Sequence, residues 1–283
     1  MTHETRRRRH GAAMVLVLAG ALVAALTAAS TAFASSTDHG ASFAVRCDFS
    51  HRLSDDPIVH PGVPGAAHSH DFFANDSTDA NSTAESLRAA TTTCTRTADT
   101  AAYWLPTLSW NGQQLDSNRA VFYYRSGGKN HETIKPFPAG LKVIAADQKR
   151  IWWRCGRPDK GGGTHAPPKQ CDTGELGVRI LFPDCSNGHL DSTNHKSHMA
   201  YSRIRDGKVR CPRSYPRPVP ALTMNVTFPI PDGPGEVTLS SGDASTMHAD
   251  FFNAWDQDAL AALVEDCIND VPPSKPRPPE CQA

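Results

Sequence analysis

The chain has 283 residues, with 29 basic and 29 acidic side chains and a formal net charge of +0 at pH 7. A balanced charge provides no extended basic surface, which argues against nucleic acid or an anionic membrane as the partner. The length fits one large domain or two small ones and allows a substantial apolar core.

The first segment has the three parts of a secretory signal peptide. Arginines at positions 6 to 9 form a positive region, residues 12–29 form an apolar run, and Ala32-Phe33-Ala34 offers a small-residue cleavage site. We therefore predict a signal peptide over 1–34, secretion of the mature chain, and no transmembrane segment in it. Residues 35–42 are small and polar, so a flexible N-terminus is expected there.

Eight cysteines, all beyond the predicted cleavage site, indicate disulfide bonding. An even number in an exported chain is typical of disulfides, because an oxidising compartment lets them persist. Of the 105 pairings that eight cysteines allow, we expect the one that joins each cysteine to the next, since each bridge then closes a loop. Zinc binding by the cysteines is not expected, because there is no Cys-x-x-Cys pair. The cysteines are Cys47, Cys94, Cys155, Cys171, Cys185, Cys211, Cys267 and Cys281.

Short segments of strand character, separated by turn signals, follow from residue 43 onward. Strands are expected at 43–49, 103–110, 119–125, 141–146, 151–155, 175–183 and 222–228. The last of these has the clearest alternation of apolar and polar residues, and Asn111-Gly112 is a strong turn signal. Several short strands with regular turns favour a sandwich or a related architecture. We predict a mainly β fold, a single disulfide-bonded β-sandwich-like domain with long loops over residues 43–270.

Two helices and a proline-rich tail complete the expected organisation. A short helix is expected around 84–90. Near the C-terminus, Asp256 can cap a helix in which apolar residues from Leu260 to Cys267 recur at helical spacing. The tail, residues 271–283, is too rich in proline to form regular structure alone, so a bridge from Cys267 to Cys281 would hold it.

Three polar motifs are candidates for a shared site. An extended backbone places the imidazoles of His68 and His70 on one side, a spacing at which both can bind one metal ion. His195 and His198, three residues apart, reach the same side of a turn, and His248 repeats the two-residue spacing with a carboxylate. Nitrogen and oxygen ligands suit a transition ion such as zinc better than calcium. The predicted metal ligands are His68, His70, His198 and His248.

Carboxylates near these histidines suggest acid–base chemistry. Asp191 is either a capping residue in a loop, a general base, or the group that fixes the tautomer of His195 or His198. Two carboxylates suffice for glycoside cleavage. An alternative is therefore that Asp243 or Asp250 pairs with Asp191 as acid and base. The predicted catalytic residues are Asp191, His195, His198 and Asp250.

Two further residues are predicted to bind substrate. Trp152 and Trp153 point to opposite faces of an expected strand, so one of them can stack on a sugar ring. We assign this role to Trp152 and add Asp243 as a polar contact. The histidines can also act as neutral acid–base groups without a metal, and the sequence leaves both possibilities open.

These motifs, taken together and in order, resemble a known family. The motifs are Asp56-Pro57-Ile58-Val59, His68-Ser69-His70, Tyr103-Trp104, Phe182-Pro183-x-Cys185, Asp191 with His195-Lys196-Ser197-His198, Cys211-Pro212, Leu239-Ser240-x-Gly242-Asp243 and His248-Ala249-Asp250-Phe251. Over roughly residues 43–268, the chain resembles the domain-of-unknown-function family numbered nineteen ninety-six. That family occurs in secreted actinobacterial and fungal proteins, often beside WSC modules. The resemblance implies secretion, a single disulfide-bonded domain, and extracellular or cell-wall glycan as the substrate class.

Two functions are consistent with these observations. The first is a secreted protein that acts on or binds extracellular or cell-wall polysaccharide through a His/Asp cleft, as a glycan hydrolase with or without help from a metal ion. The alternative is a non-catalytic structural or adhesive wall protein in which the same residues form a buried hydrogen-bond network. Such a network must be fully hydrogen-bonded and would offer no open, concave surface.

Overall fold

The computed structural model describes residues 41–117, 119–130, 133–270 and 278–281, all within the unit Asp38–Ala283. The predicted signal peptide (1–34), and most of the predicted N-terminal segment (35–42) and proline-rich tail (271–283), lie outside the described residues. Strands far outnumber helices among the described elements, which confirms the predicted mainly β class.

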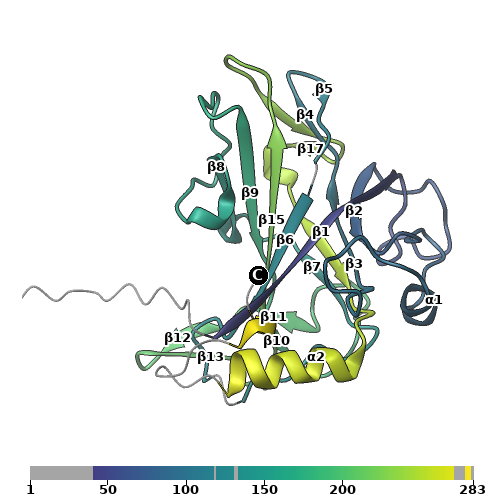
Figure 1. The fold of residues 1–283 in the computed structure, drawn as a ribbon, viewed down its shortest axis with the longest axis vertical. Coiled ribbons are helices and arrows are strands. Elements are labelled where there is room, and N and C mark those ends of the chain that lie inside the picture. Colours follow the sequence, from purple (N-terminus) through teal and green to yellow (C-terminus); the bar gives the residue numbers. More distant parts are fainter. Residues whose placement is uncertain (1–40, 118, 131–132, 271–277, 282–283) are drawn as a thin grey trace, which may run out of the picture. The chain divides into compact units, whose positions relative to one another are not determined.

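Nine strands form one antiparallel sheet in the order β7-β18-β3-β2-β1-β6-β15-β9-β8 (Figure 1). The strands are β1 (Ser42–Leu53), β2 (His70–Ala74), β3 (Ala102–Pro106), β6 (Arg119–Arg125), β7 (Lys142–Ala145), β8 (Ile151–Cys155), β9 (Glu175–Leu181), β15 (Ala221–Pro229) and β18 (Ala249–Phe252). The two edge strands, β7 and β8, follow each other in the chain, so the connection between them joins the two edges of the sheet.

Strand β1 links the two halves of this sheet. Residues 42–48 pair with β6, and residues 49–53 pair with β2. The register shifts between Phe49 and His51, and an irregularity of this kind bends a strand. One half therefore consists of β6, β15, β9 and β8, and the other of β2, β3, β18 and β7, with β1 shared between them.

The two halves pack face to face around the main core. The ring of Tyr103 on β3 stacks on that of Phe122 on β6 with centroids 3.8 Å apart, although these strands are not neighbours in the sheet. A smaller apolar cluster lies on the outer face of β2 and β3, where Phe72 and Trp104 are covered by Ile58. The sandwich-like expectation is thereby confirmed, in the form of one sheet that curls onto itself.

Smaller sheets extend from this frame. The expected strand 103–110 divides at Thr107, whose backbone N–H donates to Ser69 (3.0 Å) and whose hydroxyl donates to Asp71 (2.9 Å). Its second part therefore joins another sheet. The smaller sheets are β17 (Gly242–Asp243), β16 (Val237–Leu239), β4 (Leu108–Trp110) and β5 (Gln113–Gln114); β11 (Met199–Ala200), β10 (Cys185–Ser186) and β14 (Arg217–Pro218); and β12 (Arg203–Arg205) with β13 (Lys208–Arg210).

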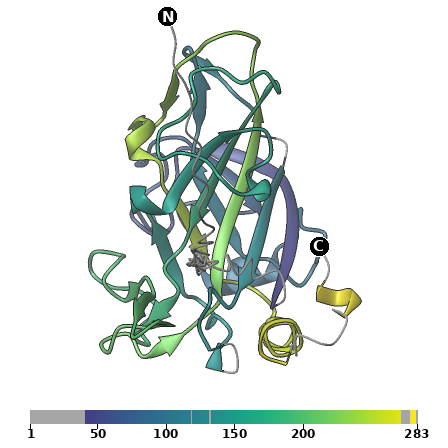
Figure 2. The ribbon, with the colours of Figure 1, turned by 90° about the vertical axis from the view of Figure 1, so that its left-hand side faces the viewer.

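Both predicted helices are present. Helix α1 (Ala84–Ala89) begins at a capping box formed by Thr83 and Ser86. Helix α2 (Gln257–Val264) is capped by Asp256, whose carboxylate accepts from the Ala259 N–H at 3.0 Å, and it continues as a π-helical turn, Glu265–Asn269. Both views show α2 at the lower end of the sheet (Figures 1 and 2). Among the described residues, no helix has the length and apolar character needed to cross a bilayer.

Single-turn helices complete the regular structure. These are η2 (Gln148–Arg150), η3 (Pro158–Lys160), η4 (Ala244–Thr246) and η6 (Pro279–Cys281). Each cysteine forms a disulfide with its neighbour along the chain, as predicted. The bridges are Cys47–Cys94, Cys155–Cys171, Cys185–Cys211 and Cys267–Cys281. The last one joins η6 to the π-helical turn that follows α2.

A polar network crosses the main core. Asp99 is fully buried, and burial raises the pKa of its carboxyl to about 8. One carboxyl oxygen of Asp99 accepts from the Tyr103 hydroxyl at 2.9 Å, and Tyr103 is hydrogen-bonded to Tyr124. The indole N–H of Trp255 donates to Tyr124 at 3.0 Å. Because these side chains come from β3, β6 and the segment before α2, the network connects both halves of the sheet to the C-terminal helix.

This network predicts the effect of a single hydroxyl. In Tyr103→Phe, one buried oxygen of Asp99 loses its partner, and we expect the free energy of unfolding to fall by about 1–3 kcal/mol. Chemical denaturation measures this change. The matched control is Tyr123→Phe, since Tyr123 lies on the outer, half-buried side of β6 and a change there is expected to stay within about 0.5 kcal/mol. Equal effects of the two substitutions would contradict the role of the network.

Candidate metal centre

Three histidines from two segments meet on the outer face of the half-sheet that contains β2, β3 and β18. His70 begins β2, His68 lies two residues before it, and His248 directly precedes β18. β2 and β18 flank β3, and their pairing registers place His70 and Asp250 on the same face of the sheet as Trp104. His248, two residues before Asp250, lies on this face as well.

The histidine side chains are close enough to share one ion. The ring centroids of His68 and His70 lie 4.2 Å apart, those of His68 and His248 lie 5.1 Å apart, and those of His70 and His248 lie 5.8 Å apart. One ring nitrogen from each lies within 4.8 Å of the other two. Ligands that share a zinc ion each lie about 2.0–2.1 Å from it, so nitrogens as far as 4.8 Å apart must move closer together to bind one ion.

Hydrogen bonds fix which nitrogen faces the cluster. Nδ1 of His70 lies 2.9 Å from the carbonyl oxygen of Asp55, and Nδ1 of His248 lies 2.9 Å from that of Thr246. A carbonyl can only accept, so each Nδ1 carries the proton and each Nε2 keeps its lone pair. Metal-binding histidines are usually oriented in this way by a second hydrogen bond.

Burial keeps these imidazoles neutral. Desolvation lowers the pKa of His70 to about 3 and that of His248 to about 4, and it also lowers the pKa of His68. The positive charge of neighbouring histidines lowers the pKa of His70 and His248 further. A histidine must be deprotonated to bind a metal ion, so the three rings are already in the required state near neutral pH.

Two carboxylates complete the cluster. Asp250 is buried, and an oxygen of its carboxylate lies 3.7 Å from Nε2 of His248. Ligand atoms of Asp56, His70 and Asp250 lie within 4.8 Å of one another. Burial, and then the charge of Asp56, raise the pKa of Asp250 well above its ordinary value, and burial also raises the pKa of Asp56. Imidazole nitrogens beside carboxylate oxygens form a donor set suited to a transition ion.

Several polar atoms of this cluster have no hydrogen-bond partner among the residues that the structure describes. They are Nε2 of His68, Nε2 of His70 and both carboxylate oxygens of Asp250. A buried polar group without a partner costs about 1–3 kcal/mol, so a network selected for stability would pair them. The geometry therefore fits a ligand set better than it fits the purely structural alternative.

A cavity of about 340 Å³ opens beside the cluster. Its polar wall includes His68, His248 and Asp250, and its apolar wall includes Ile144. Lys196, an exposed residue, also lines this cavity, and its positive charge acts on both His248 and Asp250. The cluster is thus accessible to a small group of a larger molecule.

Residues 191–198 contribute less to this site than the sequence predicts. His198 is buried and both ring nitrogens are engaged, Nε2 with the carbonyl of Lys142 at 2.6 Å and Nδ1 with the hydroxyl of Ser192 at 3.1 Å. It therefore has no nitrogen available for a metal, and we do not include it among the candidate ligands. His195 instead pairs with Asp191 through Nδ1 at 3.0 Å, in a half-exposed loop.

The two predicted substrate-binding residues lie in other places. Trp152 is half-buried and lines a separate cavity, whereas Trp153 is fully buried in the core, in agreement with their expected opposite orientations. Asp243 is exposed and caps η4 by accepting from the Ser245 N–H at 2.8 Å. Two residues of the cluster were not predicted as site residues, Asp56 and Lys196, and neither has a spacing that marks it as a ligand.

His198→Ala separates the two polar regions. We expect the substitution to lower the free energy of unfolding by about 1–3 kcal/mol, because it leaves the buried carbonyl of Lys142 without its partner. Metal binding should be unchanged, because His198 has no nitrogen facing the cluster. Thermal denaturation and metal titration of the variant, beside an exposed His189→Ala control, measure both effects. Loss of metal binding with unchanged stability would contradict this placement.

Most of the sequence matches one known family. The model of one family, described as domain of unknown function (DUF1996), matches residues 56–255. Comparison with curated proteins and with solved structures gives no significant match. The matched region contains every residue of the cluster, from Asp56 to Asp250. The match covers more than half of the sequence and confirms the resemblance: the chain belongs to the DUF1996 family.

Proposed function

We propose that this protein is a secreted, metal-dependent hydrolase that acts on extracellular polysaccharide. Nε2 of His68, His70 and His248 would hold a transition ion such as zinc. The observation that carries the proposal is the group of buried, unpartnered nitrogen and oxygen atoms beside an open cavity. Three protein ligands with one open position is the usual arrangement of a catalytic zinc site, whereas structural zinc sites are closed.

Neighbouring residues would have further roles in the reaction. A bound zinc ion lowers the pKa of a water molecule and polarises the group under attack. Asp250 is placed to accept a proton, because its carboxylate lies 3.7 Å from Nε2 of His248 and lines the same cavity. Asp55 and Thr246 orient His70 and His248 through their carbonyls. Lys196 supplies a positive charge at the rim of the cavity.

Export and a glycan substrate are supported by different observations. The four disulfides are of the kind that persist in oxidising compartments, and the predicted signal peptide over 1–34 agrees with them. The glycan class is supported by the resemblance to secreted proteins that often carry WSC modules.

Metal content tests the proposed centre. Purified mature protein without an affinity tag is expected to bind one transition ion per chain, measured by elemental analysis after dialysis. His70→Ala and His248→Ala should each lose most of the affinity, because each removes one of three nitrogen ligands. His189→Ala, an exposed histidine outside the cluster, is the control and should bind as the unaltered protein does. If the histidine variants retain the ion, the proposed centre is wrong.

Asp250→Asn tests the hydrolytic role of the carboxylate. The amide keeps the shape of the side chain but cannot accept the proton, so kcat should fall by about 10²–10⁴ in protein that elemental analysis shows to be loaded with the ion. The assay follows new reducing ends from a panel of polysaccharides. The control is Asp232→Asn, an exposed loop residue, which should leave kcat unchanged. Unchanged kcat in Asp250→Asn, with active protein, would rule out the proposed proton transfer.

A further inference from the structure

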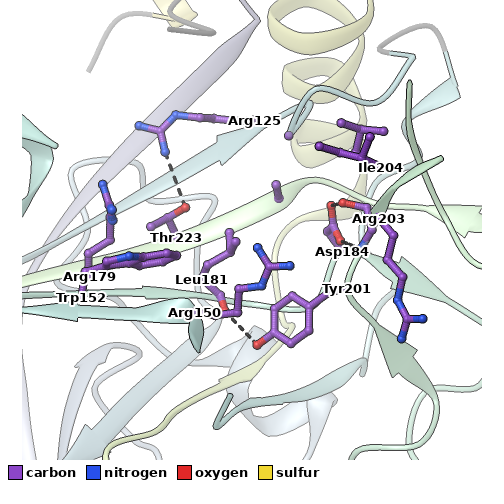
Figure 3. A pocket seen from close by; sticks show the side chains of 14 residues that line it. Arg125, Arg150, Trp152, Arg179, Leu181, Asp184, Tyr201, Arg203, Ile204 and Thr223 are labelled. Carbon is purple, nitrogen blue, oxygen red and sulfur yellow. Dashed lines mark hydrogen bonds between the residues drawn. The ribbon is translucent and has the colours of Figure 1, made fainter. Parts of the chain in front are cut away.

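A second cavity, of about 640 Å³, lies on the outer face of the other half-sheet (Figure 3). Its floor is formed by side chains of β6, β8, β9 and β15, among them Arg125, Trp152 and Arg179. Arg150, Tyr201 and the hairpin of β12 and β13 form its sides. We call this cavity the arginine groove, because it is lined by Arg125, Arg150, Arg179 and Arg203.

The positive charge of the groove is not balanced by its own carboxylates. Asp184 lines the groove, but its carboxylate binds Lys129 and also accepts from the backbone and hydroxyl of Ser202 at 2.7 and 2.8 Å. In the described part of the chain, no carboxylate lies within ion-pair distance of Arg150 or Arg179. An anion from outside can therefore pair with these guanidinium groups.

Aromatic rings hold the guanidinium groups in place. Arg179 lies over the ring of Trp152 at 4.5 Å from its centroid, and Arg150 lies over the ring of Tyr201 at 5.2 Å. Stacking restricts a guanidinium group while its N–H edge stays available to a carboxylate or sulfate. Burial, and then the charge of Arg154, lower the pKa of Arg179, so a bound anion would relieve an unfavourable environment. Figure 3 shows Arg125, Arg150 and Arg179 projecting around the groove.

The groove and the metal centre are joined by short segments. Ala146 lines the cavity of the metal centre and Arg150 lines the groove, so four residues of extended chain limit their Cα separation to about 14 Å. Gln148, between them, is anchored to the carbonyl of Met247 at 2.7 Å. Lys196 and Tyr201 form a second such connection, one in each cavity. The linings of the two cavities therefore approach each other at these two places.

We infer that the arginine groove binds carboxylated sugar units of an acidic polysaccharide, next to the unit that reaches the metal centre. This inference rests on the proposed function and specifies its substrate class. Planar guanidinium groups recognise carboxylates through two parallel hydrogen bonds, which a neutral sugar cannot supply. Sulfated glycans carry a similar charge on a tetrahedral group, and nucleic acid carries it on phosphates, so both serve as comparisons.

Binding measurements with defined polymers test the inference. The unaltered protein should bind polygalacturonate, with affinity that decreases as salt increases, and should bind a neutral glucan at least tenfold more weakly. Arg150→Ala and Arg179→Ala should each weaken polygalacturonate binding by about tenfold or more. Arg179→Lys keeps the charge but loses the planar pair of donors, and an intermediate loss is expected. Arg213→Ala, an exposed arginine outside the groove, is the control with the same charge change.

His70→Ala separates this inference from the proposed function. Its groove is intact, so it should keep most of its affinity for polygalacturonate, even where hydrolysis is lost. Retained binding by His70→Ala, with loss in the arginine variants, supports the groove whether or not the metal centre is catalytic. Equal binding by the arginine variants and the control would overturn the inference. Tighter binding of a sulfated glycan or of single-stranded DNA than of polygalacturonate would overturn the assignment to carboxylated sugars. Thermal denaturation of each variant verifies that it is folded.

Discussion

The bend in β1 is the constraint on which both candidate sites depend. A strand that pairs with β6 over its first part and with β2 over its second must join two half-sheets, and the register shift between Phe49 and His51 turns one toward the other. The inner faces of the two half-sheets then bury the aromatic core, and both candidate sites lie on the outer faces. The metal cluster lies on the outer face of β2, β3 and β18, whereas the arginine groove lies on the outer face of β6, β15, β9 and β8.

The two sites differ in the charge of their side chains. In the metal cluster, burial disfavours ions, so the imidazoles are neutral and the pKa of Asp250 is raised. A divalent ion reverses this balance, because it supplies the positive charge that buried lone pairs and a carboxylate can bind. In the arginine groove the guanidinium groups are partly exposed, and aromatic rings orient those of Arg150 and Arg179. The proposed functions follow this difference, a cation at the first site and an anionic ligand at the second.

Local patterns in the sequence were sufficient for much of this account. Alternation predicted strands such as β1 and β15, the cap at Asp256 with helical spacing predicted α2, and the order of the cysteines predicted all four bridges. The pairs His68 with His70 and His248 with Asp250 were recognised from their two-residue spacing. The cluster also needs the pairing of β2 and β18 with β3, which is non-local. His198 was misassigned because its partner, the carbonyl of Lys142, lies 56 residues away, and Asp56 was missed because a loop of prolines and glycines carries no periodic signal.

X-ray absorption spectroscopy of the protein loaded with one equivalent of zinc tests the central claim most directly, because it reports the atoms bound to the ion. The account predicts first-shell nitrogen and oxygen atoms at about 2.0–2.2 Å with the outer-shell scattering of three imidazole rings. This imidazole signal should be lost in His70→Ala, which is expected to bind the ion far more weakly. A first shell of oxygen alone, or the scattering of a single imidazole such as that of His195 beside Asp191, would place the ion elsewhere and contradict the assignment of the cluster.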